Sequence, residues 1–131
     1  MKTVVKAIIY RNNKYLLQLR DNKLNISYPN HWSFFGGEVD QNETEEQALK
    51  RELFEELSWV PEQFIYYTTF VDLSTKAIVR IFLIHFRNDN KKLKLNEGQK
   101  MEWFNIDEIK NLLKTPSNMY YLIKKINNKK L

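Results

Sequence analysis

The sequence predicts an α/β (α+β) domain built on a mixed β-sheet, and three observations carry this prediction. Short runs of β-branched, aliphatic and aromatic residues recur along the chain. A segment with the leucine spacing of an amphipathic helix interrupts these runs near the middle, and further helical segments close the chain. Strands that precede, separate and follow helices are typical of a sheet packed by helices.

The chain begins with a predicted hairpin, in which the runs TVVKAIIY and YLLQLR flank the polar turn residues RNNK. A polar loop over residues 21–30 follows. The stretch HWSFFGG then predicts a short strand that runs into a double glycine. We therefore expect paired strands to lead directly into the helical segment.

A helix is predicted over residues 44–57, because leucine recurs at four-residue spacing from Leu49 onward. Thr44 and Gln47 match the S/T-x-x-E/Q capping box, in which two side chains supply partners for the unpaired amides of a helix start. Pro61 ends the segment.

The second half of the chain predicts more strands and two helices. The runs FIYYTTFVDL, KAIVRIFLIHF and KMEWFN are expected strands. The lysine-rich loop RNDNKKLKLNEG lies between the last two and is expected to be the most exposed part. Asn105 is suited to cap a short helix, IDEIKNLL, and SNMYYLIKKI predicts a terminal helix.

Length and composition favour one folded domain over residues 1–131, because 131 residues with 43% hydrophobic content supply one core. The chain has no cysteine, which excludes thiolate nucleophiles and cysteine-based zinc sites and fits a reducing, cytoplasmic location. Lys6 interrupts what could be a signal-peptide core, and the longest apolar run is too short to cross a bilayer. We expect no membrane partner.

The net charge of +5 suits polyanionic partners such as nucleotides or nucleic acid. The joint excess of Lys, Asn and Ile, as an AT-rich genome produces, explains the charge equally well. Charge alone therefore does not choose a partner.

Three glutamates share one face of the predicted helix, because residues i, i+3 and i+4 lie together. This brings Glu52, Glu55 and Glu56 into one arc beside the leucine stripe. Like charges so placed cost about 0.2–0.5 kcal/mol per pair, and Arg51 alone cannot neutralise three carboxylates. A divalent cation such as Mg²⁺ can, since it takes several oxygen ligands and commonly bridges carboxylates to phosphates. A solvated glutamate face is the alternative.

The distribution of glycine favours the metal-site hypothesis. Gly36, Gly37 and Gly98 are the only glycines, and each lies beside one of the acidic elements. Glycine lets a backbone approach a ligand closely, although a tight turn explains the double glycine as well.

These residues resemble the Nudix box, G-x5-E-x7-R-E-U-x-E-E-x-G-U, where U is a bulky apolar residue. The box spans Gly37 to Trp59, and the matching residues are Gly37, Glu43, Arg51, Glu52, Leu53, Glu55 and Glu56. Ser58 replaces the last glycine, which puts the left-handed helix cap in question, and Phe35 replaces the proline common before Gly-Gly. The resemblance implies the family's α/β/α sandwich over essentially the full chain.

The resemblance also implies a hydrolase that uses Mg²⁺ or Mn²⁺ to cleave a nucleoside diphosphate linked to another group. The implied metal ligands are Glu52, Glu55, Glu56 and the main-chain carbonyl of Gly36. Arg51 and Glu43 would orient these ligands. The metals would polarise the pyrophosphate and lower the pKa of a water molecule that attacks phosphorus.

Segments outside the box resemble mutator-type (MutT) Nudix enzymes. In NEGQKMEWF, Glu97 is similar to a glutamate that serves as a further ligand or base, with an ordinary loop acid as the alternative. In TPSN, Asn118 is similar to an asparagine that reads an oxidised purine, or it caps the last helix. Trp32 and Gly37 are further candidates for substrate contact, and core packing is the simpler role for Trp32.

The leading functional hypothesis is a metal-dependent pyrophosphohydrolase of a nucleoside triphosphate resembling 8-oxo-dGTP or dGTP, with a monophosphate and pyrophosphate as products. A nucleotide-sugar or ADP-ribose hydrolase is the alternative within the family, since residues outside the box choose the substrate. An isopentenyl diphosphate isomerase needs a cysteine that the chain lacks. Monomer and homodimer remain equally open.

A non-catalytic nucleotide or nucleic-acid binder is the alternative from another class, although the complete glutamate set argues against it. Its basic residues would be Lys91, Lys92, Lys94, Lys124 and Lys125. A lysine-rich loop is usually a solvated one.

Overall fold

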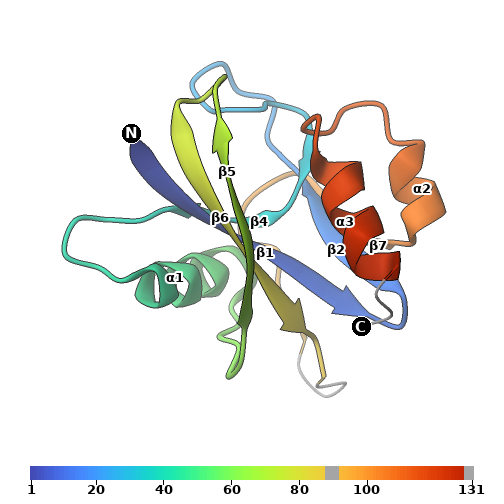
Figure 1. The fold of residues 1–131 in the computed structure, drawn as a ribbon, viewed down its shortest axis with the longest axis horizontal. Coiled ribbons are helices and arrows are strands. Elements are labelled where there is room, and N and C mark those ends of the chain that lie inside the picture. Colours follow the sequence, from blue (N-terminus) through green and yellow to red (C-terminus); the bar gives the residue numbers. More distant parts are fainter. Residues whose placement is uncertain (88–91, 129–131) are drawn as a thin grey trace.

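The structure is a computed structural model that describes residues 1–87 and 92–128. Within these residues a seven-stranded mixed sheet carries α1 on one face and α2 and α3 on the other (Figure 1). The elements are β1 (Lys2–Arg11), β2 (Lys14–Leu19), β3 (Trp32–Ser33), β4 (Phe35–Glu38), α1 (Glu45–Leu57), β5 (Ile65–Asp72), β6 (Ala77–His85), β7 (Lys100–Phe104), α2 (Ile106–Lys110) and α3 (Met119–Asn128). The predicted α/β sandwich with a mixed sheet is confirmed.

Strand β1 lies at the centre of the sheet and has two different partners along one edge. Its other edge pairs with β6 in parallel from Lys2 to Tyr10. On the divided edge, β4 pairs with the first half of β1, up to Ala7, and β2 pairs with the second half, from Ile9. The sheet therefore forks beside the middle of β1, and β2 and β4 diverge from there.

The predicted strand HWSFFGG is two strands at this fork. Trp32 and Ser33 form β3 and pair with β2, whereas Phe35 to Glu38 form β4 and pair with β1. The double glycine therefore lies inside β4 and is not a turn. Helix α2 is also shorter than predicted, because the chain leaves helical geometry at Asn111.

The β1–β2 hairpin turns through Asn12 and Asn13, which both have positive φ (51° and 62°). A two-residue loop of this kind matches the right-handed twist of the flanking strands. Within the described residues, asparagine also has positive φ at Asn30 and Asn42.

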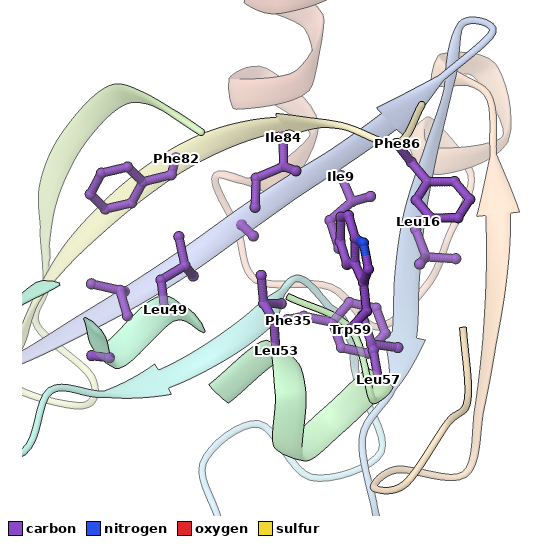
Figure 2. Close-up of a cluster of buried hydrophobic side chains, with 13 residues drawn as sticks. Ile9, Leu16, Phe35, Leu49, Leu53, Leu57, Trp59, Phe82, Ile84 and Phe86 are labelled. Carbon is purple, nitrogen blue, oxygen red and sulfur yellow. The ribbon is translucent and has the colours of Figure 1, made fainter. Parts of the chain in front are cut away.

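Two apolar clusters fill the space on either side of the sheet. Leu49, Leu53 and Leu57 of α1 are fully buried against Phe35 and residues of β1 and β6 (Figure 2). Each such leucine contributes about 1.5–3 kcal/mol relative to an exposed side chain. Residues of α2 and α3, among them the fully buried Ile123, fill the opposite face. The leucine spacing thus predicted the buried face of α1 correctly.

Helix α1 begins with the predicted capping box of Thr44 and Gln47 and ends at Ser58 in the left-handed conformation (φ 54°, ψ 37°). A non-glycine residue in this conformation costs about 1–2 kcal/mol. The Ser58 hydroxyl accepts a hydrogen bond from Asn96 Nδ2 at 2.8 Å, and the Asn96 amide donates to the Glu56 carbonyl at 2.9 Å. The cap that the resemblance put in question is therefore present, and it holds the following loop against the helix end.

The lysine-rich loop was predicted to be the most exposed part of the chain, and among its described residues Lys92, Lys94, Asn96 and Glu97 are exposed. Leu93 and Leu95 pack on the α1 cluster, and the Lys94 amide donates to the Leu57 carbonyl at 3.0 Å. Lys91 lies outside the described residues. No helix in residues 1–87 and 92–128 has the length and apolar character needed to cross a membrane.

Candidate active site

The three glutamates of α1 form a gradient from the protein interior to solvent. Glu56 is 3% exposed, and the side chains of Glu52 and Glu55 are 16% and 47% exposed. Burial raises the pKa of Glu56 and, to a smaller degree, that of Glu52, because a carboxylate loses hydration inside the protein. The alternative of a solvated glutamate face is therefore wrong for Glu56.

Hydrogen bonds fix both oxygens of the Glu56 carboxylate. The Gly36 amide donates to Oε1 at 2.8 Å, and Gln18 Nε2 donates to Oε2 at 3.0 Å. Gln18 is itself buried on β2, and its Nε2 also lies 3.4 Å from the Phe34 carbonyl. Because one hydrogen bond comes from β4 and the other from β2, the buried Glu56 carboxylate is held in a single orientation.

Arg51 organises the rest of the acidic turn. Its Nε and Nη2 donate to the two oxygens of Glu43 at 2.9 and 2.7 Å, a bidentate pair. Its Nη1 donates to Glu52 at 2.9 Å and to Glu55 at 3.4 Å. Hydrogen bonds from Arg51 lower the pKa of Glu43 to about 2. One guanidinium thus links the side chains that precede and follow it in the box.

The two glycines of β4 are required for different reasons. Gly36 has φ +136°, and a Cβ there would lie 2.1 Å from the Val5 carbonyl oxygen of β1. A Cβ at Gly37 would lie 2.5 Å from the Glu52 carboxylate. Gly36 thus lets β4 pair with β1, whereas Gly37 leaves room for a side chain of the site.

A cavity of about 260 Å³ opens beside the acidic turn, on the face of the sheet that carries α3. Gly36, Gly37 and Glu38 border both the cavity and the acidic turn. The apolar part of its wall is formed by Val4, Phe34, Phe70, Ala77, Val79, Ile81, Pro116, Met119 and Leu122. The polar and charged part is formed by Lys2, Lys6, Arg20, Ser27, Tyr28, Ser33, Asp72, Thr75 and Asn118.

The predicted residues outside the box have different positions. Asn118 lines the cavity just before α3, and its carbonyl accepts the Leu122 amide at 3.1 Å, so its roles as base reader and as helix cap stay predictions. Trp32 lies outside the cavity wall and packs edge-to-face on Phe104, with ring centroids 4.9 Å apart. Glu97 is exposed next to Asn96, whose amide is bonded to the α1 end.

A family model of the NUDIX domain matches residues 1–126. The chain belongs to the Nudix family. It is similar to the nucleoside triphosphatase NudI of Enterobacter sp. (strain 638), with 30% identity over 123 residues that cover 85% of this chain and 86% of the relative. It is also similar to the CTP pyrophosphohydrolase of Escherichia coli (strain K12), with 32% identity over 108 residues that cover 82% and 78% of the two chains.

The crystal structure of a MutT NUDIX hydrolase from Burkholderia pseudomallei has the same fold. It superposes with a TM-score of 0.78 at 20% identity and covers 95% of this chain and 97% of its own. This Nudix chain is accordingly a hydrolase with a MutT-like fold, and Nudix hydrolases act on nucleotide substrates and generally use divalent metal ions.

The donor atoms of the Nudix site suit such an ion, since carboxylate and carbonyl oxygens are the ligands of hard dications. Among the described residues, no three acidic or histidine side chains converge closely enough to form a finished metal centre. The reason is visible in the hydrogen bonds: Glu52 and Glu55 turn toward Arg51, and Glu56 turns toward the Gly36 amide. The donor atoms of these residues fit a dication. The hydrogen bond from Arg51 to Glu55 is the longest of those named, so it is the easiest to exchange for a metal ion.

Two residues of the Nudix site were missed by sequence reasoning. Lys6 of β1 donates from Nζ to the Gly36 carbonyl at 3.4 Å, and Gln18 holds Glu56. Each is a polar residue inside an apolar strand run, VVKAII and YLLQLR, and this interruption was the available signal. The structure does not support the alternative of a nucleic-acid binder that uses basic residues. Its candidate residues Lys92, Lys94, Lys124 and Lys125 are exposed on two separate segments.

Proposed function

We propose that this chain is a Mg²⁺-dependent pyrophosphohydrolase of a nucleoside triphosphate resembling 8-oxo-dGTP or dGTP, which releases the monophosphate and pyrophosphate. One observation carries the proposal: the acidic turn and the apolar cavity share Gly36, Gly37 and Glu38 as a common border. A nucleoside in the cavity would therefore extend its phosphates toward the carboxylates of α1.

The size of the cavity supports a single nucleoside. Small-molecule pockets usually measure roughly 300–1,000 Å³, and this one, at about 260 Å³, is slightly smaller than that range. Phe70 and Val79 offer apolar surface for a base, and Asn118 offers an amide for its polar edge. A nucleotide sugar or ADP-ribose carries a second sugar, for which these walls offer less room.

The names of the relatives support a triphosphate substrate as well. One is called a nucleoside triphosphatase and the other a CTP pyrophosphohydrolase. Because one relative is named a CTP pyrophosphohydrolase, a substrate panel should include a pyrimidine triphosphate.

In the proposed mechanism Glu52, Glu55 and Glu56 would hold the metal, and Glu97 would be a further ligand or base. When bound, Mg²⁺ supplies Lewis-acid polarisation of the phosphoryl oxygens. Gln18 and the Gly36 amide keep the Glu56 carboxylate in one orientation, and Arg51, steadied by Glu43, restrains Glu52. Such hydrogen-bonded support is worth about 10–100-fold in metal affinity or activity at comparable sites.

We further propose that residues 1–131 form one Nudix hydrolase domain that works in the cytoplasm. Limited proteolysis of the purified chain tests the first point, because one domain gives one protected fragment extending over nearly the whole length. Two fragments of stable size would contradict it.

The decisive experiment is a nucleotide panel with Mg²⁺ and identified products. The panel contains 8-oxo-dGTP, dGTP, CTP, ADP-ribose and a nucleotide sugar. Pyrophosphate and a monophosphate from a triphosphate are the expected products, whereas a sugar phosphate from a conjugate would favour the alternative substrates. Intact nucleotides throughout, with Glu55→Gln indistinguishable from the unmodified protein, would overturn the proposal.

A further inference from the structure

Lys6 connects the cavity to the acidic turn. It lies on β1 on the same side as Val4 and Ile8, and it is partly buried at the cavity wall. Its direct partner in the sheet register is Gly36 of β4. A lysine at this position projects from the cavity side toward the backbone of the double glycine.

The peptide groups of Gly36 separate two opposite charges. On the amide side, Gly36 donates to the buried Glu56 carboxylate at 2.8 Å. On the carbonyl side, it accepts from the Lys6 ammonium at 3.4 Å. Burial lowers the pKa of Lys6, and so does Arg20 on the cavity wall, whereas the carboxylates of Glu56 and Glu52 favour its charged form. The Lys6 amino group therefore lies at the Gly36 carbonyl, and two of the three carboxylates favour its charged form there.

This position conflicts with one role that the family resemblance assigned. The Gly36 carbonyl is an implied metal ligand, yet its oxygen already accepts a hydrogen bond from a cation. An ammonium and a dication a few ångströms apart repel each other strongly in a partly buried site, where the effective dielectric constant is low. Both cations are therefore not expected at this oxygen together.

We propose that the Lys6 ammonium is the resident cation at the Gly36 carbonyl and keeps a divalent ion from that oxygen, so that the carboxylates of α1 bind fewer dications than they would without it. The inference rests on the proposed metal-dependent function and specifies how many ions the site holds. Lys6 is a positioning residue in this account, because it acts on the metals through charge.

The test measures Mn²⁺ binding to the metal-free protein in the absence of nucleotide. Electron paramagnetic resonance detects the unbound Mn²⁺ at each concentration. Lys6→Met removes the charge and keeps an unbranched side chain of similar length, whose apolar part resembles the methylene chain of lysine. We expect Lys6→Met to bind one more Mn²⁺ per chain, or to bind Mn²⁺ at least tenfold more tightly. Lys6→Arg keeps a cation and is expected to retain the unmodified stoichiometry.

Lys2→Met is the matched control, because it removes the same charge from the same face of β1 about 13 Å away, at the strand rise of about 3.3 Å per residue. Its Mn²⁺ stoichiometry is expected to equal that of the unmodified protein. Circular dichroism and thermal unfolding establish that each variant is folded. If Lys6→Met does not fold, Lys6→Gln provides the same comparison.

Equal Mn²⁺ stoichiometry and affinity for the unmodified protein and Lys6→Met would overturn the inference and leave the proposed function standing. Unchanged Mn²⁺ binding with a raised KM for nucleotide would also overturn it and assign Lys6 to a substrate phosphate. No Mn²⁺ binding by any variant, together with no turnover in the nucleotide panel, would overturn the proposed function as well.

Discussion

The acidic turn and the apolar cavity meet at the double glycine, but they are built in different ways. The acidic turn comes mainly from one continuous segment, residues 43–56, and hydrogen bonds between 2.7 and 3.4 Å fix its side chains. The cavity is assembled from strands and a helix that are distant in the sequence, and apolar packing forms much of its wall. The proposed reaction chemistry is thus encoded by a local segment, whereas the proposed choice of substrate depends on the tertiary structure.

Replacement of the buried Glu56 carboxylate is expected to show the largest difference between the acidic turn and the apolar cavity. Glu56→Gln should lower kcat/KM by more than about 10²-fold for every nucleotide, because loss of a proposed metal ligand should cost at least as much as loss of the groups that support one, about 10–100-fold. The melting temperature should not fall, because the variant removes a charge that burial disfavours. Glu46→Gln, exposed on the same helix, is the control for kinetics and thermal unfolding. A Glu56→Gln enzyme with a tenth or more of the original activity would contradict this assignment.

The two glycines of β4 are expected to respond differently to a single methyl group. Gly37→Ala should fold normally but lower kcat/KM by about 10²-fold, because the methyl group displaces the flexible Glu52 carboxylate. Gly36→Ala should destabilise the fold by about 3 kcal/mol or more, since its methyl group meets the β1 backbone. Urea unfolding and steady-state kinetics of both variants measure the difference. Equal loss of stability in the two variants would refute the distinction.

A change in the cavity wall should alter selectivity and leave the chemistry intact. Phe70→Ala is expected to raise KM about tenfold for the preferred nucleotide with a small change in kcat, because an apolar contact with the base is lost. Val71→Ala, on the exposed side of the same strand, is the control. A comparable fall in kcat for Phe70→Ala would mean that this residue also positions the phosphates.

The smallest expected effect concerns acid stability. Because the pKa of Glu43 falls from 4.5 to about 2 on folding, its pairing with Arg51 stabilises the native state above pH 4.5 and loses this effect as the pH falls toward 2. Glu43→Gln should therefore have a lower melting temperature than the unmodified protein at pH 6, and the difference should shrink between pH 4.5 and 2. A difference that is constant over this range would exclude the pairing as its source.

The comparison also explains which features could be read from the sequence. Glu52, Glu55 and Arg51 were predictable as one cluster because helical periodicity alone brings them together. The cap at Thr44 has a local signature as well.

Other features depend on how separate strands meet. Lys6 and Gln18 reach the acidic turn only because β1 exchanges one partner strand for another, and no local pattern in HWSFFGG marks that exchange. The packing of Trp32 on Phe104 likewise depends on both β3 and β7 pairing with β2. Sequence periodicity describes a strand's faces but not its neighbours.

The asparagines with positive φ have a consequence for the denatured state. Glycine samples more backbone conformations than any other residue, so a chain with few glycines has a less diverse denatured ensemble. Here the hairpin tip is formed by Asn12 and Asn13, and glycine occurs at only three positions in 131 residues. Less conformational entropy is therefore lost when the loops become ordered. This smaller entropy loss offsets the backbone strain of asparagine at positive φ in the folded state.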